Sequence, residues 1–202
     1  AITDMGFSQV LLVTGEHEQK VGMPYFSEVL PAIRSKASNV MMEVQPLPQK
    51  DYETLKTLGV DAVLVYQETY NPQAYAKYHT RGKKQDFLWR LQASDRIGAA
   101  GIDKIGIGAL LGLGDWRTDS VMTALHGQLI QQHYWRSRVA ISFPRLRQCE
   151  GNTNDSVNLL TQGTLFTALN PALNCVTHIP LPPQGDWPFA ELDIIINNNN
   201  NK

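Results

Sequence analysis

The sequence predicts an α/β fold, a partial (β/α) barrel with about five βα units. Five short apolar runs do not alternate with polar residues, which is typical of strands in a parallel sheet covered on both faces. Segments with helical periodicity lie between the runs, as βαβ units require. Polar residues follow the ends of at least four runs, where the active sites of barrels lie.

The apolar runs give the predicted strands. Each run is rich in valine, isoleucine, leucine or methionine and has the length of a single strand. The predicted strands are Gln9–Val13, Asn39–Val44, Asp61–Tyr66, Lys104–Leu111 and Arg138–Phe143.

The segments between the runs give the predicted helices. Phe26, Val29, Leu30 and Ile33 recur at helical spacing, and Gly59 suits the end of a helix. Leu125, Leu129 and Ile130 are expected on one face of the last helix. The predicted helices are Pro24–Ala37, Asp51–Leu58, Pro72–His79, Gln85–Ala100 and Thr118–Ser137.

The spread of polar residues favours a barrel over an open, doubly wound sheet. A doubly wound sheet gathers its ligand groups near one switch point, usually after the first strand. In this sequence they follow the first, second, third and fifth runs. The residues are Gly15, Glu16, Gln45, Gln67, Glu68, Arg145 and Arg147. We therefore expect them at a shared rim.

The last quarter of the chain differs from the rest. Residues 1–149 are predicted to form the barrel, and residues 150–202 an irregular tail with a short helix near Asp155–Leu169. The proline-rich stretch and the asparagine tract support an irregular conformation.

Composition narrows the class of protein. The chain has 202 residues, of which 43% are hydrophobic, and a net charge of -1, so it shows no general preference for nucleic acid or a membrane surface. Its two cysteines, Cys149 and Cys175, and its five histidines lack the spacing of a metal site. A cytoplasmic location is expected by default.

Two glycine-containing segments each allow a ligand role and a structural role. Gly15-Glu16 offers a backbone open to a ligand and a carboxylate for an ammonium group, or a tight βα turn. Gly106 and Gly108 alternate within a strand, which suits close approach by a flat ligand or a crowded barrel strand.

Two basic segments also allow more than one interpretation. Arg145 and Arg147 point to one side of an extended segment and suit a carboxylate ligand, or ion pairs with rim acids such as Glu68. Gly82 to Arg90, G-K-K-Q-D-F-L-W-R, is a lid or helix start rather than a nucleic-acid patch, because it is one short cluster in a neutral chain.

Several of these motifs occur together, in the same order, in one known family. The match covers roughly Ile2 to Cys149. It includes the runs V-T-G-E-H, V-G-M-P-Y-F, M-E-V-Q-P-L, V-Y-Q-E-T-Y, G-K-K-Q-D-F-x-W-R, D-R-I-G-x-A-G-I-D-K-I-G-I-G-A-L-L-G-L and S-F-P-R-L-R. In these runs the chain resembles the 2-iminoacetate synthases, the tyrosine lyases of thiamine thiazole biosynthesis. These are radical S-adenosylmethionine enzymes.

The resemblance implies a barrel of radical S-adenosylmethionine type and a specific reaction. It implies a [4Fe–4S] cluster held by a C-x-x-x-C-x-x-C loop, S-adenosylmethionine as cofactor, and tyrosine cleaved at Cα–Cβ to 2-iminoacetate and p-cresol. It also implies thiazole synthase and an electron donor such as flavodoxin as partners. The alternatives are a related lyase for another aromatic amino acid and a non-catalytic remnant that binds S-adenosylmethionine.

The resemblance also implies roles for the rim residues, although it names no catalytic residue. Residues matching the cofactor site are Gly15, Glu16, Glu68, Gly106, Gly108 and Leu110. Residues matching the substrate site are Gln67, Arg145 and Arg147.

The chain departs from the family pattern at both ends. The cluster loop and first strand belong upstream of Ile2, and neither Cys149 nor Cys175 replaces the loop, so we expect a fragment that is inactive alone and supplies no metal ligands. After Arg147 stands Gln148, where the family has proline. Without a first strand, Val10–Val13 becomes an open apolar edge, so we expect marginal solubility or self-association.

Overall fold

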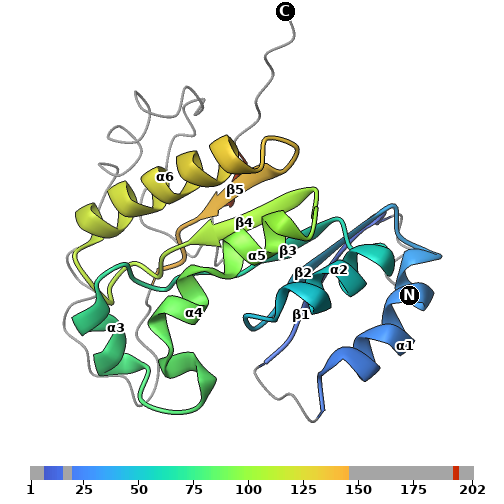
Figure 1. Ribbon diagram of the computed structural model, residues 1–202, viewed down its shortest axis with the longest axis horizontal. Coiled ribbons are helices and arrows are strands. Elements are labelled where there is room, and N and C mark those ends of the chain that lie inside the picture. Colours follow the sequence, from blue (N-terminus) through green and yellow to red (C-terminus); the bar gives the residue numbers. More distant parts are fainter. Residues whose placement is uncertain (1–6, 16–19, 146–192, 196–202) are drawn as a thin grey trace, which may run out of the picture. The chain divides into compact units, whose positions relative to one another are not determined.

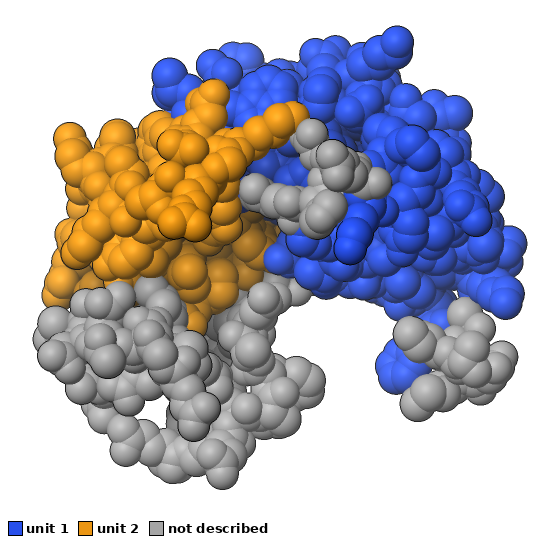
Figure 2. Space-filling view, turned by 90° about the horizontal axis from the view of Figure 1, so that it is seen from below, with its two compact units in different colours: residues 1–65, 88–106, 130–139 blue, residues 66–87, 107–129, 140–202 orange. Residues whose placement is uncertain are grey.

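The computed structural model describes residues 7–15, 20–145 and 193–195. The chain divides into two compact units whose segments alternate along the sequence (Figure 2). Unit 1 comprises residues 1–65, 88–106 and 130–139, and unit 2 comprises residues 66–87, 107–129 and 140–202. The boundary predicted at residue 149, the expected helix at Asp155–Leu169 and both cysteines lie outside the described residues.

Parallel pairing of neighbouring strands confirms the α/β prediction. In unit 1, β1 (Gln9–Val13) pairs with β2 (Asn39–Glu43), β2 with β3 (Ala62–Leu64), and β3 with the start of β4 (Lys104–Gly108) (Figure 1). The strands are neighbours in chain order, as in a (β/α) barrel and unlike a doubly wound sheet.

The last two strands, β5 and β6, run in opposite directions. β5 (Arg138–Ser142) follows β4 in the sheet, and β6 (Asp193–Ile195) pairs with β5 in antiparallel fashion. β6 was not predicted, because it lies in a segment expected to be irregular. β3 and β4 are shorter than the predicted Asp61–Tyr66 and Lys104–Leu111.

The first two helices of unit 1 each bury one apolar face, and for the first of them the periodicity predicted the buried residues. α1 (Met23–Arg34) buries Phe26 and Leu30, and α2 (Gln49–Thr57) buries Tyr52 and Leu55. Burial raises the pKa of the Tyr52 hydroxyl to about 12, and the hydrogen bond that this hydroxyl accepts from the Leu47 N–H at 2.9 Å opposes the shift only in part.

The predicted helix Gln85–Ala100 is wrong as a single element. The structure has a 3₁₀ turn, η2 (Lys83–Gln85), then α4 (Phe87–Leu91) and α5 (Ala93–Ala99). The Arg96 guanidinium donates to the Trp89 carbonyl at 2.7 Å and stacks 3.6 Å from the centre of the Trp89 ring. This side chain occupies a carbonyl that a continuous helix would use for its own backbone hydrogen bond.

Unit 2 contains α3 (Pro72–Tyr78) and most of α6 (Trp116–His133). Asn71 caps α3 by accepting from the Ala74 N–H at 3.0 Å. The expectation of one apolar face on α6 is only partly met, because Ile130 is buried whereas Leu125 and Leu129 are exposed. No helix among the described residues combines the length and apolarity needed to cross a bilayer.

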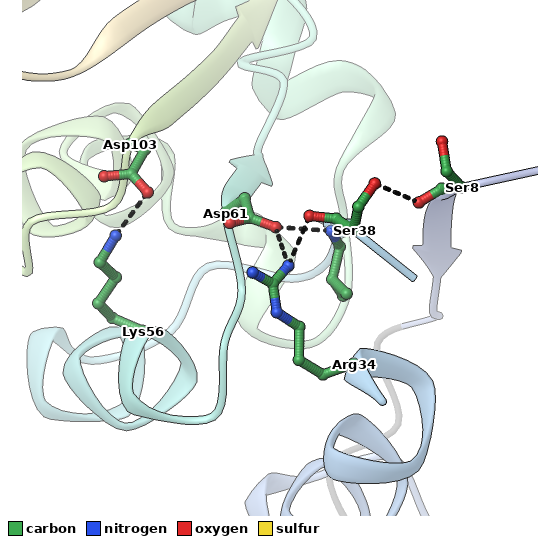
Figure 3. Close-up of polar contacts among 7 residues, drawn as sticks. Ser8, Arg34, Ser38, Lys56, Asp61 and Asp103 are labelled. Atoms are coloured by element: carbon green, nitrogen blue, oxygen red, sulfur yellow. Dashed lines mark hydrogen bonds and ion pairs between the residues drawn. The ribbon is translucent and has the colours of Figure 1, made fainter. Parts of the chain in front are cut away.

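A carboxylate in unit 1 joins two αβ connections, the one from α1 to β2 and the one from α2 to β3. Asp61 Oδ2 accepts from the Val40 N–H at 2.7 Å and from Arg34 Nη1 at 2.8 Å, and the same nitrogen donates to the Ser38 carbonyl (Figure 3). The Lys56–Asp103 pair in the same view is a more exposed contact between two side chains. Asp61 therefore fixes the start of β2 beside the start of β3.

We expect Asp61→Ala to lower the free energy of unfolding by about 2 kcal/mol, because it leaves the Val40 N–H without its acceptor. Lys56→Ala is the matched control, since an exposed ion pair contributes below about 1 kcal/mol. Urea denaturation followed by circular dichroism measures both. Equal losses in the two variants would contradict the assigned role of Asp61.

The exposed edge of β1 predicts self-association. Among the described residues β1 pairs only with β2, and Leu11 and Val13 on one face of β1 are exposed. We expect sedimentation velocity to show concentration-dependent association that Val13→Lys suppresses. Gln9→Lys adds the same charge on the same strand without removing apolar surface and is the control. A monomer at all concentrations would refute this expectation.

Candidate functional site

The end of β3 departs from regular strand geometry at Glu68. The β3–β4 register pairs Leu64 with Gly106, and an isolated bridge pairs Glu68 with Ala109. Between these two pairs the β3 segment advances by four residues and the β4 segment by three. The extra residue in the β3 segment is the feature of a β-bulge. Glu68 is the one non-glycine residue with positive φ among the described residues, at 73°.

This bulge explains why a carboxamide and a carboxylate stand side by side. Neighbours in a regular strand point to opposite faces, whereas a bulge re-aims a side chain. The Gln67 N–H donates to the Gly108 carbonyl at 2.9 Å, and the Leu110 N–H donates to the Glu68 carbonyl at 2.7 Å. The structure thus brings together four of the predicted site residues, all in unit 2: Gln67, Glu68, Gly108 and Leu110.

The Gln67 side chain fits a polar ligand. Gln67 is 3% exposed, and neither its Oε1 nor its Nε2 has a hydrogen-bond partner among the described residues. Buried amides almost always have partners, so an orphaned amide indicates a group that supplies them. A carboxamide both donates and accepts, which suits the polar groups of an amino acid or nucleoside.

Lys84 is a site residue that the sequence analysis missed. Its Nζ lies 3.2 Å from Glu68 Oε1, and Glu68 is the more buried partner. The Tyr75 hydroxyl donates to the Lys84 carbonyl at 2.6 Å and so fixes the backbone of this segment. The G-K-K-Q-D-F run contained the signal, but its contact with Glu68, 16 residues away, is visible only in the fold.

The structure shows a steric reason for both strand glycines. A Cβ on Gly106 would lie 2.4 Å from the Leu64 side chain, and one on Gly108 would lie 2.1 Å from the Ser142 carbonyl oxygen. The crowded strand therefore accounts for both residues. Gly15 differs, because a Cβ there would have no atom within 4 Å.

The remaining predicted residues are only partly described. Arg145 is exposed and forms a bridge with Leu111, whereas Glu16 and Arg147 lie outside the described residues. Among the described residues Glu68 pairs with Lys84, and the ion pair suggested between the rim arginines and Glu68 stays a prediction.

The chain's residues fit S-adenosylmethionine better than they fit a cluster. A C-x-x-x-C-x-x-C loop needs three thiolates and the sequence has two cysteines, while the described residues contain no group of three metal-binding side chains. We therefore derive no step through a cluster. The carboxylate of Glu68 suits the polar groups of the nucleoside cofactor.

Known proteins are similar to this chain in sequence and in fold. It is 60% identical over 152 residues to the 2-iminoacetate synthases of Escherichia coli and of Salmonella typhimurium, a match that covers 75% of this chain and 40% of each relative. The chain thus spans less than half the length of the curated relatives it matches. No family model matches.

Solved structures show the same fold. The FeFe-hydrogenase maturase HydG from Carboxydothermus hydrogenoformans superposes with a TM-score of 0.67 at 39% identity, over 73% of this chain and 35% of that chain. Coproporphyrinogen III oxidase from Escherichia coli, a radical SAM enzyme, shares the fold alone, with a TM-score of 0.51 at 13% identity over 70% of this chain and 32% of that chain. This chain is therefore related by sequence to the 2-iminoacetate synthases and has the α/β fold of the radical S-adenosylmethionine enzymes.

Proposed function

We propose that this chain is a segment of a tyrosine lyase that uses S-adenosylmethionine and releases 2-iminoacetate and p-cresol. The two products together contain the atoms of tyrosine, divided at the Cα–Cβ bond. The similarity to 2-iminoacetate synthases supports this reaction. At the site, the supporting observation is the orphaned amide of Gln67 beside the carboxylate of Glu68 on a bulge at the end of β3.

The cofactor would supply the radical that starts the reaction, and the chain's own residues would bind and orient. Glu68 accepts hydrogen bonds from the cofactor, with Lys84 beside it to balance the charge. Gly15 and Glu16 hold the methionine ammonium group, and Gly106, Gly108 and Leu110 lie along the adenosine.

The substrate would be held by a separate set of groups. Gln67 binds a polar group of tyrosine through its carboxamide, and Arg145 and Arg147 hold a carboxylate, of tyrosine or of the methionine moiety. The full protein would act in the cytoplasm, receive electrons from a donor such as flavodoxin, and deliver the imine to thiazole synthase.

One observation favours a second candidate for the chain by itself. With two cysteines it lacks the thiolates of a cluster loop, so it binds S-adenosylmethionine without turnover under this alternative. A related lyase for another aromatic amino acid is the remaining alternative, because Gln67 and the arginines recognise groups common to all amino acids.

A chimera tests the reaction. The aligned stretch of the Escherichia coli 2-iminoacetate synthase is replaced by the matching residues of this chain. We expect tyrosine-dependent release of p-cresol under anaerobic, reducing conditions, measured by liquid chromatography. Glu68→Gln should lower turnover by about ten- to a hundredfold, because a charge-assisted hydrogen bond is lost.

Glu53→Gln is the matched control for Glu68→Gln, since Glu53 is an exposed residue of α2 whose Oε1 accepts from Gln49 Nε2 at 2.9 Å. A folded chimera that releases product from another aromatic amino acid and not from tyrosine would support the related lyase. Binding of S-adenosylmethionine without any product would support the non-catalytic alternative.

Alanine variants of Gly108 and Gly15 distinguish a role in packing from a role in ligand binding. We expect Gly108→Ala to lower the free energy of unfolding by about 1–3 kcal/mol, because its Cβ meets the Ser142 carbonyl. Gly15→Ala should leave stability unchanged, because the space around it is open, and should weaken binding of S-adenosylmethionine. Urea denaturation and calorimetric titration measure the two effects. Unchanged affinity in Gly15→Ala would remove Gly15 from the cofactor site.

A further inference from the structure

A buried carboxylate from α6 lies under the segment that follows Glu68. Asp119 is 1% exposed, and its Oδ1 accepts from the Thr69 hydroxyl at 3.0 Å and from the Tyr70 N–H at 2.7 Å. The Thr69 hydroxyl oxygen in turn accepts from the Asn71 N–H at 3.2 Å. All four residues belong to unit 2. One carboxylate thus fixes three successive residues of the loop.

Glu68 is held from both directions along the chain. Before it, the Gln67 N–H binds the Gly108 carbonyl, and the Leu110 N–H binds the carbonyl of Glu68 itself. After it, Thr69 and Tyr70 are held by Asp119. A left-handed conformation costs free energy in a residue with a side chain, so it persists only where the surroundings over-determine it. Asp119 supplies the constraint on the carboxyl side.

The packing around Asp119 leaves the loop little freedom. A Cβ on Gly114 would lie 2.8 Å from the Thr69 hydroxyl oxygen and 3.1 Å from Asp119 Oδ2. The Tyr70 hydroxyl lies 2.8 Å from His126 Nδ1, which ties the same loop to α6 a second time. The contact is close-packed, so a shift of Asp119 must move the loop.

The burial of this carboxylate costs stability. Burial raises the pKa of the Asp119 carboxyl, and the hydrogen bonds from the Tyr70 N–H and the Thr69 hydroxyl oppose that shift only in part. A carboxyl whose pKa is higher in the folded state than in the unfolded state destabilises the fold when it ionises, as pH rises through its ordinary range. Titratable groups whose pKa is shifted by burial are typical of functional sites.

We propose that Asp119 is a positioning residue that holds Glu68 in its left-handed conformation and thereby fixes the direction of the Glu68 carboxylate. The inference rests on the proposed function of Glu68 as a contact to the nucleoside cofactor. Asp119 touches neither cofactor nor substrate in this role. It acts through Thr69 and Tyr70.

The first test measures the backbone of the free 202-residue chain by nuclear magnetic resonance. A residue with positive φ gives a strong cross-peak between its own amide and α protons. We expect that cross-peak for Glu68 in the wild type and in Asp119→Asn, which keeps the Oδ1 acceptor, and its loss in Asp119→Ala. Asp115→Ala is the matched control, because Asp115 is an exposed carboxylate at the start of the same helix.

A second pair of variants covers the case in which Asp119→Ala does not fold. Thr69→Val removes the hydroxyl that binds Asp119 with little change in shape, and Thr69→Ser restores it. We expect Thr69→Val to weaken the Glu68 cross-peak and Thr69→Ser to preserve it. A Glu68 cross-peak that stays unchanged in folded Asp119→Ala or Thr69→Val would overturn the proposal.

The third measurement is a double-mutant cycle with S-adenosylmethionine, followed by calorimetric titration. Asp119→Ala should weaken affinity about tenfold, the equivalent of one charge-assisted hydrogen bond, and Asp119→Asn should restore most of it. In the Glu68→Ala background, Asp119→Ala should have no further effect, since it acts through Glu68. An equal loss in both backgrounds would overturn the proposal.

Failure of the proposed function is distinguishable from failure of this inference. A wild-type chain that binds no S-adenosylmethionine, but in which Asp119→Ala abolishes the Glu68 cross-peak, would refute the cofactor role and keep the positioning role. Binding that depends on Glu68 but not on Asp119 would keep the cofactor role and refute the positioning role.

Discussion

The left-handed conformation of Glu68 is the constraint on which the polar end of β3 depends. It follows from a mismatch of one residue between the β3 and β4 segments. It is held by hydrogen bonds from the Gln67 N–H to the Gly108 carbonyl, from the Leu110 N–H to the Glu68 carbonyl, and from the Tyr70 N–H to Asp119. A regular strand would send the Gln67 and Glu68 side chains to opposite faces. The bulge instead allows a buried amide and a half-buried carboxylate to be neighbours at the end of the strand, where barrels place their ligands.

The periodicity of the sequence was sufficient for the fold class. The five apolar runs correspond to β1 to β5, and Phe26 and Leu30 are buried, as their helical spacing predicts. Periodicity reports which face of an element is apolar, but not where a side chain interrupts its backbone. The break between α4 and α5 therefore escaped prediction, because it depends on Arg96 binding the Trp89 carbonyl. The exposure of Leu125 and Leu129 escaped it because a pattern cannot tell what covers a face.

The sequence indicated some residues of the candidate site, but not the tertiary contacts that hold them. Gln67 and Glu68 were singled out because polar residues at the end of an apolar strand suggest a rim. Lys84 and Asp119 were not, since each reaches the β3 end through tertiary contacts, 16 residues from Glu68 and 50 residues from Thr69. Sequence alone also left the strand glycines open between ligand and packing roles. The contacts of Leu64 and Ser142 show that packing alone already requires both.

The similarity to the 2-iminoacetate synthases covers 40% of those proteins, so this chain holds one part of the machinery they use. We propose that this part binds and orients the cofactor and the substrate. In this proposal the cofactor groups lie at the end of β3 and on the β4 segment, the substrate groups include Gln67 and Arg145, and α6 holds the end of β3 through Asp119.

A crystal structure of the chain soaked with S-adenosylhomocysteine tests this account most directly. We expect the nucleoside to lie at the end of β3, with a Glu68 carboxylate oxygen within hydrogen-bonding distance of its polar groups, and we expect Glu68 to keep its positive φ. A ligand bound elsewhere on the chain, without contact to Glu68, would contradict this account.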